Sequence, residues 1–246
     1  LYNVGNFYSE YSHLLENKEY SLNDLNSKNI MDNWVISRLN YFGELITNEL
    51  NNYNTVKACS YIRDFVDELS TWYVRVNRDR FNENSKEAVQ TLSLVLEHLS
   101  RLISPIIPFI YERVYRTVLD KESVHLQKWP EFNKDRINKK LMQEMDSVRL
   151  IVSEGLRQRD KAGLGLKWPL PKAIIKTTSK LNNELKEIIK HQLNVREIEI
   201  KKIDSKQEKQ LKGIEVELDT KLTKELEAEG YARQISRQVQ SFRKKL

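Results

Sequence analysis

Apolar residues recur at helical spacing through most of the first half of the chain. The clearest case is Phe65, Leu69, Trp72 and Val76, which follow one another at steps of four, three and four. Such spacing places them on one face of a helix. The segments with this period are residues 34–52, 55–81, 86–103 and 109–119. Short links join them, so the pattern predicts an antiparallel helix bundle.

Polar residues mark where these helices are expected to begin and end. Asp32 precedes the first long apolar period and is a candidate N-cap, as are Asn54 or Thr55, and Ser85, for the next two helices. Pro105 and Pro108 interrupt the pattern because proline lacks an amide donor and clashes with the preceding turn. The polar, Asn-rich residues 16–31 are expected to form a linker.

The second half changes character. Residues 135–162 predict one long helix that ends in basic residues followed by Gly163 and Gly165. After it, Ala173–Ile175 forms an apolar run typical of a strand, and two later segments alternate apolar with charged residues. A short helix falls between these strands. The last helix starts near Thr223, with an apolar seam of Ile235, Val239, Phe242 and Leu246.

The predicted fold is therefore mainly α. A helix-bundle domain over residues 1–132 is followed by a small α+β module over residues 133–246. The charge divides the same way: the first part carries 14 Lys+Arg against 18 Asp+Glu, a net of −4, and the second 27 against 17, a net of +10. A basic second half makes nucleic acid a reasonable partner.

Several classes of function find no support. The single cysteine, Cys59, excludes a disulfide framework and a multi-cysteine zinc site, and helical spacing suggests that it is buried. The four histidines have no metal-ligand spacing. No apolar run reaches the roughly 18 residues that cross a bilayer. No phosphate loop, nucleophile elbow or metal-protease motif occurs. We therefore expect a binding module with no metal and no catalytic residues.

The helix around Trp72 offers the most informative chemistry. Arg75 and Arg78 are three residues apart and share a face beside the apolar seam, and Arg80 extends the row. Guanidinium groups suit bidentate contact with phosphate and stacking on exposed bases. The alternative is that these arginines are solvated or pair with acids such as Asp67 and Asp79. Trp34 and Trp72 themselves are expected in the core.

The order of segments resembles the C-terminal, tRNA-binding part of isoleucyl-tRNA synthetases of the archaeal or eukaryotic type. The bundle motifs include residues 32–39, 63–65 and 102–109, and nearly the whole chain takes part. Glu122–His125 and the appended module with Leu226–Gly230 favour the isoleucyl member. The motifs that carry the resemblance are Asp32-Asn33-Trp34-Val35, Arg63-Asp64-Phe65, Trp72-Tyr73, Ser104-Pro105-Ile106-Ile107-Pro108, Glu122-Ser123-Val124-His125, Lys161-Ala162-Gly163, Pro169-Leu170-Pro171 and Glu227-Ala228-Glu229-Gly230.

The family's two ATP-handling signatures and its editing domain are absent, and the chain starts without Met. The resemblance thus implies a cytoplasmic fragment that binds the anticodon arm of an isoleucine tRNA without activating isoleucine. Its partners would be that tRNA and the upstream part of the synthetase, with no membrane and no DNA. ATP and magnesium would belong to the full-length enzyme only.

The residues expected to contact tRNA lie in both halves. Trp168 is a candidate base-stacking residue, with packing against Pro169 and Pro171 as its alternative. Arg38 could contact phosphate or form an internal pair. Arg233 and Arg237 could contact phosphate or simply be solvated. The complete set is Arg38, Arg75, Arg78, Arg80, Arg157, Arg159, Lys161, Lys167, Trp168, Arg233 and Arg237.

Two other hypotheses stay open. One is the corresponding domain of a valyl- or leucyl-tRNA synthetase, which would share the bundle motifs. The other is a non-catalytic helical scaffold that binds protein, with its basic faces solvated. Added salt separates the scaffold from an RNA-binding protein, because binding through several phosphates weakens steeply as salt rises.

Overall fold

The computed structural model describes residues 2–15, 25, 27–203 and 214–243. The chain folds as two compact units, Leu1–Met142 and Gln143–Leu246, and each is described by itself. The first is helical and the second combines helices with a three-stranded sheet. A helix bundle followed by a small α+β module is therefore confirmed, whereas the division at residues 132 and 133 stays a prediction.

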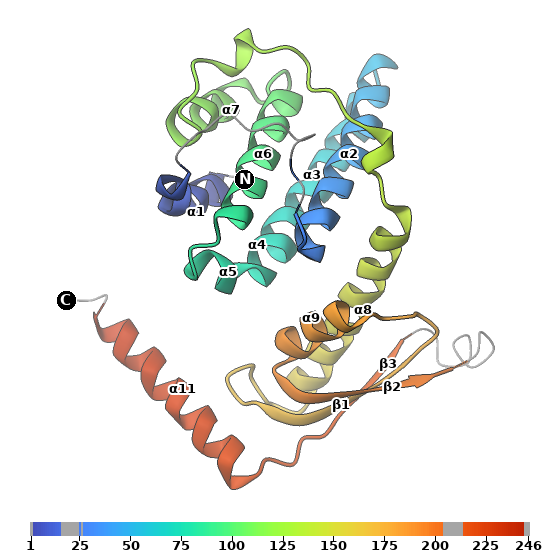
Figure 1. Cartoon of the computed structure of the whole chain (residues 1–246), viewed down its shortest axis with the longest axis vertical. Coiled ribbons are helices and arrows are strands. Elements are labelled where there is room, and N and C mark those ends of the chain that lie inside the picture. Colours follow the sequence, from blue (N-terminus) through green and yellow to red (C-terminus); the bar gives the residue numbers. More distant parts are fainter. Residues whose placement is uncertain (1, 16–24, 26, 204–213, 244–246) are drawn as a thin grey trace. The chain divides into compact units, whose positions relative to one another are not determined.

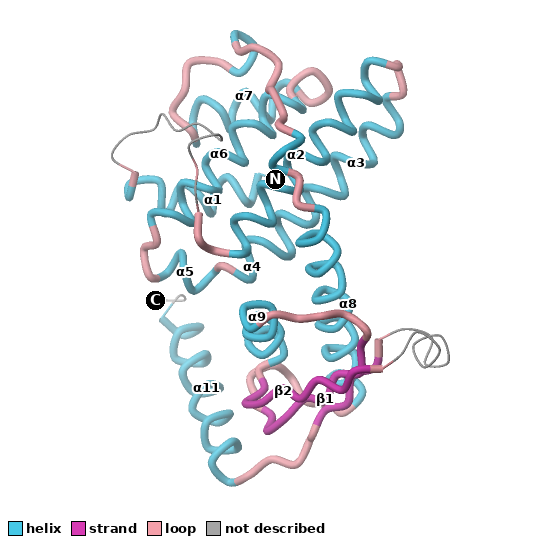
Figure 2. The backbone as a smooth tube through the Cα atoms, turned by 45° about the vertical axis from the view of Figure 1, so that its right-hand side comes forward, coloured by secondary structure: helices cyan, strands magenta, loops and turns pink. Residues whose placement is uncertain are grey.

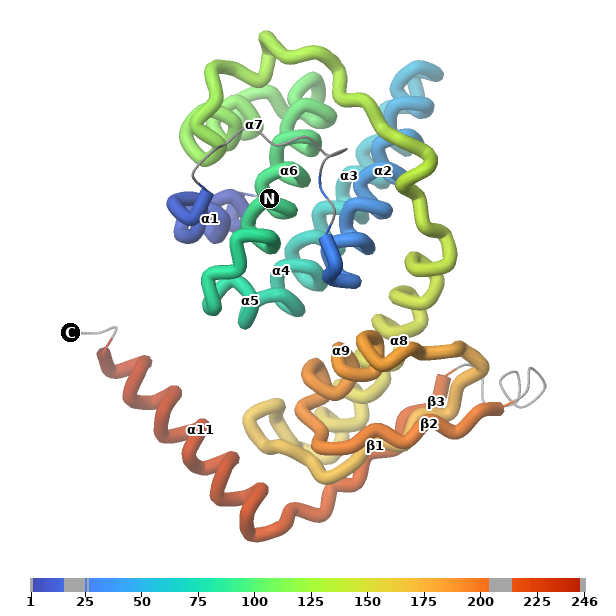
Figure 3. The backbone as a smooth tube through the Cα atoms, in the orientation of Figure 1, coloured from blue at the N-terminus to red at the C-terminus, as the bar shows by residue number. Residues whose placement is uncertain are grey.

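The first unit is a bundle of short and medium helices joined by tight turns (Figure 1). The helices α2 and α3 form an antiparallel hairpin, and α6 runs through the middle of the unit (Figure 3). Its α-helices are α1 (Tyr2–Tyr11), α2 (Ile30–Asn51), α3 (Thr55–Asp67), α4 (Val74–Val76), α5 (Arg78–Asn82), α6 (Lys86–Ile103) and α7 (Pro108–Arg113). Single turns and wider π-helical turns connect them, namely η1 (Ser12–Leu14), η2 (Glu68–Tyr73), η3 (Val114–Val118), η4 (Val124–Leu126) and η5 (Lys134–Arg136).

The apolar periods of the sequence become the core of this unit. On α6 the whole predicted face, from Ala88 to Ile103, is buried. Trp34 and Trp72 are also buried, as expected. Burial of such large side chains removes apolar surface from water and provides the main stabilisation of the bundle.

Two of the predicted caps are confirmed and one is wrong. The side chains of Asn54 and Ser85 accept hydrogen bonds from the amides of Lys57 and Ala88 at the starts of α3 and α6. Helix α2 instead begins at Asn29, whose side chain accepts from the Met31 amide at 2.8 Å. Asp32 lies inside the first turn, where it is fully buried. The expected linker at residues 16–31 lies mostly outside the described residues.

The segment predicted as one helix over residues 55–81 is helical, but its type of helical turn changes along its length. It widens into the π-helical turn η2 at Glu68–Tyr73 and breaks at Asn77. At this break, the Asn77 side-chain amide donates a hydrogen bond of 2.9 Å to the Tyr73 carbonyl one turn earlier. A π turn shifts the register of the following side chains. It keeps Leu69, Trp72 and Tyr73 buried together.

The crossing segment after η3 differs in part from its prediction. Val124 is buried, but Leu126 is 68% exposed, so not every apolar side chain there is covered. Phe132 packs directly over Gly43 of α2, where an added Cβ would lie 2.3 Å from its ring. Cys59 on α3 is exposed, which overturns the expectation that it is buried. It lies one residue beyond the buried face that Ala58 and Ile62 define.

The second unit has two helices on one side of a sheet (Figure 2). Helix α8 starts four residues later than predicted, and the strand predicted at Ala173–Ile175 is longer than expected. The elements are α8 (Lys139–Lys161), β1 (Leu170–Thr177), α9 (Asn183–Leu193), β2 (Val195–Lys202), β3 (Glu215–Leu218) and α11 (Lys224–Arg243).

The sheet has the order β2-β1-β3, with β1 parallel to β2 and antiparallel to β3. Ala173, Ile175 and Thr177 alternate on its buried face. Helix α8 passes so close to α9 that a Cβ added to Gly155 would meet Leu193 at 2.5 Å. The glycine thus allows the close approach of the two helices.

Helix α11 is the element that departs most from the expectation. The predicted seam was meant to be buried, yet Ile235 is 60% and Phe242 65% exposed. Leu246 lies outside the described residues. The start of the helix does pack, because Leu226 and Gly230 are buried. Helical periodicity was predicted correctly here, but burial was not.

Candidate nucleic-acid interface

Trp72 and Arg75 form a compact aromatic and cationic pair on the first unit. The Trp72 ring is held by η2 and is only 4% exposed. The Arg75 guanidinium carbon lies 5.5 Å from the centre of that ring, within cation–π range. Partial burial against the ring lowers the pKa of Arg75 from its usual value, and the side chain stays cationic at neutral pH. The indole therefore fixes where this guanidinium points.

Arg75 and Arg78 are the cations with uncommitted donors on this surface. Both are exposed, and within the described parts of the chain neither forms an ion pair or a side-chain hydrogen bond. They lie on either side of the break at Asn77, on α4 and at the start of α5. The two free guanidinium groups, one of which lies over the Trp72 ring, can bind phosphate oxygens in a bidentate manner.

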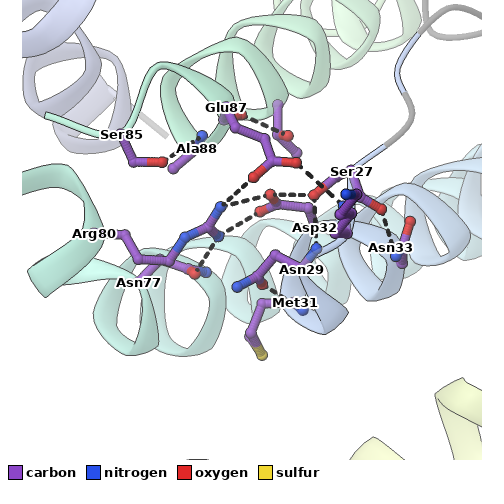
Figure 4. A network of polar contacts seen from close by, with 12 residues as sticks. Ser27, Asn29, Met31, Asp32, Asn33, Asn77, Arg80, Ser85, Glu87 and Ala88 are labelled. Carbon is purple, nitrogen blue, oxygen red and sulfur yellow. Dashed lines mark hydrogen bonds and ion pairs between the residues drawn. The ribbon is translucent and has the colours of Figure 1, made fainter. Parts of the chain in front are cut away.

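Arg80 is used internally. Its two terminal nitrogens each donate to one oxygen of the Asp32 carboxylate at 2.8 Å (Figure 4). The Tyr73 hydroxyl and the Ser27 hydroxyl donate to the same carboxylate, also at 2.8 Å. Burial and the Asp32 charge raise the pKa of Tyr73 well above its usual value. Arg80 thus holds α2, η2 and α5 together, and the geometry favours a structural role for it over phosphate contact.

Arg38 also forms an internal pair. Its Nε donates to a Glu68 carboxylate oxygen at 2.7 Å, and a terminal nitrogen donates to the other oxygen. The guanidinium lies over the Phe42 ring, 4.7 Å from its centre. Both partners are buried. Of the two alternatives for Arg38, the structure places it in the internal pair.

Arg159 of the second unit also makes internal hydrogen bonds. It is 2% exposed, and its donors bond to the backbone carbonyls of Leu193, Asn194 and Trp168 at 2.8 to 3.0 Å and of Gly165 at 3.3 Å. Burial lowers its pKa to about 10. With its donors occupied, Arg159 joins the end of α8 to the end of α9, and the geometry favours this structural role.

The other basic residues near the Gly163 turn are more available. Arg157 pairs with Glu154 on the exposed face of α8, and this pair raises the pKa of Arg157. Lys161 is exposed and without a polar side-chain partner among the described residues. Lys167 donates to the Gln234 side chain at 2.7 Å and lies 5.2 Å from the Trp168 ring centre.

Trp168 packs against helix α11. A Cβ added to Gly230 would lie 2.1 Å from its ring, and Tyr231 meets the ring edge-on with centres 5.0 Å apart. The predicted alternative of packing therefore has a partner that the sequence did not indicate. Trp168 is half-buried, so part of the ring stays accessible.

Arg233 and Arg237 lie on the exposed part of α11. Arg233 donates to Glu229 one turn earlier at 2.6 Å, and Glu229 also pairs with Arg196 of β2. Arg237 has no such partner among the residues described. Arg237 thus joins Arg75, Arg78 and Lys161 as a cation with free donors.

Sequence reasoning missed the acids that pair with Arg80 and Arg38, and the glycine that packs against Trp168. Asp32 and Glu68 each fall on a helix among apolar residues, at positions where only a paired charge can be buried. That placement was the available signal for Arg80 and Arg38. Gly230, in the middle of a helix, was a comparable signal for close packing.

No metal centre or transmembrane segment emerges from the part of the chain that the structure describes. None of its residues form a group of three or more His, Cys, Asp or Glu side chains able to hold a metal ion. No helix there is long and apolar enough to cross a membrane.

Comparison with known proteins agrees with a helical bundle that is followed by a basic second unit. Residues 32–175 match the family described as the anticodon-binding domain of tRNA ligase, and this match covers more than half of the chain. The chain belongs to that family. The matched range runs from α2 in the bundle to β1 of the second unit.

Two relatives of this chain are isoleucine–tRNA ligases. The chain is 36% identical over 210 residues to the one from Clostridium novyi, a match that covers 81% of this chain and 20% of the relative. It is 37% identical over 176 residues to the one from Cutibacterium acnes, covering 68% of this chain and 16% of the relative. The chain thus spans about one fifth of the length of these relatives.

Proposed function

We propose that this chain binds the anticodon arm of an isoleucine tRNA as part of an isoleucine–tRNA ligase. The observation that carries the proposal is that the exposed guanidinium groups of Arg75 and Arg78 have no ion pair among the described residues, and that of Arg75 lies over the buried Trp72 ring. Membership of the anticodon-binding family and identity to isoleucine–tRNA ligases support it.

The chemistry of an anticodon loop fits these residues. Its phosphates need fixed cations, and such contacts position the loop without reading its sequence. Its unstacked bases can lie on aromatic or guanidinium planes and present their edges for hydrogen bonding. Of the predicted contact residues, Arg75, Arg78, Lys161 and Arg237 are exposed and have no ion pair or side-chain hydrogen bond among the described residues.

The finer features of the assignment rest on the resemblance. The Glu122–His125 segment and the appended module support the archaeal or eukaryotic type, although the relatives described above come from bacteria. Amino-acid activation, with its ATP and magnesium, would belong to the remaining part of the longer enzyme. That part and the tRNA would be the chain's partners in the cytoplasm, with no role for DNA or a membrane.

Binding to an anticodon stem-loop of isoleucine tRNA at low and moderate salt tests the proposal. A valine stem-loop serves as the competitor, and the variant is Arg75→Ala/Arg78→Ala. We expect tight binding at low salt, a steep decline with salt, and a salt slope about one to two units smaller in the variant.

The matched control is Arg113→Ala/Arg116→Ala. These two arginines are also exposed and three residues apart, at the end of α7 and in η3. Similar losses in both double variants would mean that net charge alone drives binding. Absence of binding at low salt would refute the proposal and favour a protein-binding scaffold, whose affinity would respond weakly to salt.

A further inference from the structure

A pocket of about 320 Å³ opens where helix α8 ends, at the Gly163 turn. We call it the Gly163 pocket. Its volume lies at the lower end of the range in which small ligands bind, roughly 300–1,000 Å³. The lining residues are Leu156, Arg159, Asp160, Gly163, Leu164, Gly165 and Leu166.

The backbone of this pocket is fixed rather than loose. Gly163 has a φ of +66°, a left-handed conformation that ends the helix and that glycine adopts without strain. The Leu164 amide donates back to the Arg159 carbonyl at 2.9 Å, and the Arg159 side chain donates to the Gly165 carbonyl at 3.3 Å. A ligand would therefore meet a preformed surface, which lowers the entropic cost of binding.

The pocket is accessible at its two glycines. A Cβ added to Gly163 or Gly165 would meet no atom within 4 Å, so both backbone segments face open space. Leu166 is 48% exposed and provides an apolar surface next to them. A flat ring can lie against this surface, because the glycines have no side chain to keep it away and the Leu166 side chain offers an apolar contact.

The polar groups of the pocket favour hydrogen-bond donors. The C-terminal end of a helix carries partial negative charge from its carbonyl groups. The exposed Asp160 carboxylate adds a full negative charge and accepts hydrogen bonds only. Arg159, the cation of the lining, is 2% exposed and directs four hydrogen bonds to backbone carbonyls. A phosphate would therefore be repelled here, whereas N–H groups would be accepted.

We propose that the Gly163 pocket takes one unstacked base of the bound RNA loop, a guanine whose adjacent N–H donors meet the Asp160 carboxylate while its ring lies on Leu166. This inference rests on the proposed function and names the ligand of one part of the surface. Guanine fits because its Watson–Crick edge offers two neighbouring N–H donors to the two oxygens of one carboxylate. Neighbouring Lys161 would hold the adjoining phosphate.

The test uses the full chain and an anticodon stem-loop in which each loop guanosine is replaced in turn by inosine, which lacks the 2-amino group. We expect one replacement to weaken binding roughly tenfold, the lower end of what a good base contact contributes. Asp160→Asn should lose that discrimination and bind both RNAs alike, because an amide presents only one acceptor oxygen. Its affinity for unrelated RNA should stay equal or rise as a negative charge is removed.

Two further variants separate base reading from charge and from folding. Asp146→Asn removes a carboxylate from an exposed position on the same helix and should keep the discrimination. Gly165→Ala adds a methyl group to the lining without touching the fold, and should weaken binding of the guanosine RNA to the level of the inosine RNA.

The outcomes distinguish this inference from the proposed function. If the stem-loop binds and Asp160→Asn discriminates guanosine from inosine as the unaltered chain does, the pocket assignment is wrong and tRNA binding stands. The same holds if no inosine replacement changes the affinity. If no stem-loop binds even at low salt, both the proposed function and the pocket assignment are overturned.

Discussion

The guanidinium of Arg80 and the carboxylate of Asp32 form two parallel hydrogen bonds of 2.8 Å across 48 residues of sequence. Asp32 is fully buried and the Arg80 side chain is 21% exposed. Asn77, Tyr73 and Ser27 also belong to the network, and Glu87 lies 3.5 Å from a terminal nitrogen of Arg80. A buried charge that is hydrogen-bonded on all sides fixes geometry more than it adds net stability. This pair defines how α5 lies against α2.

The first prediction concerns this pair. Asp32→Ala leaves the Arg80 charge partly buried, with Glu87 at 3.5 Å as its remaining acidic partner, and should lower the free energy of unfolding by about 3 kcal/mol. Urea denaturation measures the change. Asp64→Ala, which removes an exposed carboxylate 3.9 Å from Arg63, should cost less than about 1 kcal/mol. Equal losses in the two variants would show that the Asp32 network does not hold the bundle.

The second prediction concerns Arg159. Arg159→Lys keeps the charge but cannot span the four carbonyls, so the carbonyl of the buried residue Leu193 loses its side-chain donor, at about 1–3 kcal/mol. We expect hydrogen exchange to accelerate at the ends of α8 and α9. Arg157→Lys, at an exposed ion pair, is the matched control and should leave exchange unchanged. Unaltered exchange in Arg159→Lys would contradict the structural role of this side chain.

The third prediction tests how Trp168 and α11 fit together. In Gly230→Ala the new methyl group would collide with the Trp168 ring, so the ring and the helix must separate, at about 1–3 kcal/mol. The indole N–H signal of Trp168 in an NMR spectrum should shift strongly. Ala228→Gly changes an exposed position two residues earlier on the same helix and should leave that signal in place. A constant indole signal in Gly230→Ala would show that the two side chains are not in contact.

The fourth prediction is a pH dependence that arises from His98 on α6. Burial lowers the pKa of His98, whose Nδ1 lies 2.9 Å from the Leu94 carbonyl. Glu97 partly opposes this shift, while Arg101 and Lys121 add to it. Between the folded pKa and the unfolded value of about 6.5, the unfolded chain binds more protons, so stability falls as pH falls.

Thermal unfolding between pH 7 and pH 5 measures this effect. His98→Gln removes the titrating group and should lose less stability over that range than the unaltered chain. His125→Gln, at an exposed histidine, is the control and should behave like the unaltered chain. A steeper decline in His98→Gln would mean that the folded protein favours the protonated imidazole, contrary to its burial.

Local features of the chain predicted much of the architecture. Helical spacing located the bundle, and Asn54 and Ser85 marked true helix starts, because caps and amphipathic faces depend on neighbours along the sequence. An apolar run located β1, and alternation of apolar with charged residues located β2 and β3. The helix predicted through residue 81 was interrupted, because a π turn at Glu68–Tyr73 follows from packing and leaves no local signature.

The sequence predicted which residue types form the candidate interface, but not which of these side chains are free to bind. Arg75 and Arg78 were singled out with Arg80, yet nothing in their spacing distinguishes the free pair from the buried partner of Asp32. The same applies to Arg157 and Arg159, two residues apart, one exposed and the other closed over by backbone carbonyls. Which donors are free depends on acids and carbonyls that are distant in sequence.

The sequence by itself determined the class of fold, the helix periods and the supply of cations, since these depend on residue type and local spacing. The tertiary structure decided which cations remain available, because an ion pair such as Arg38 with Glu68 forms only when distant segments are packed together. It also decided burial. The apolar residues of α11 recur at helical spacing, and Cys59 lies at helical spacing from Ile62. Both the α11 seam and Cys59 are nevertheless exposed, because no described element covers them.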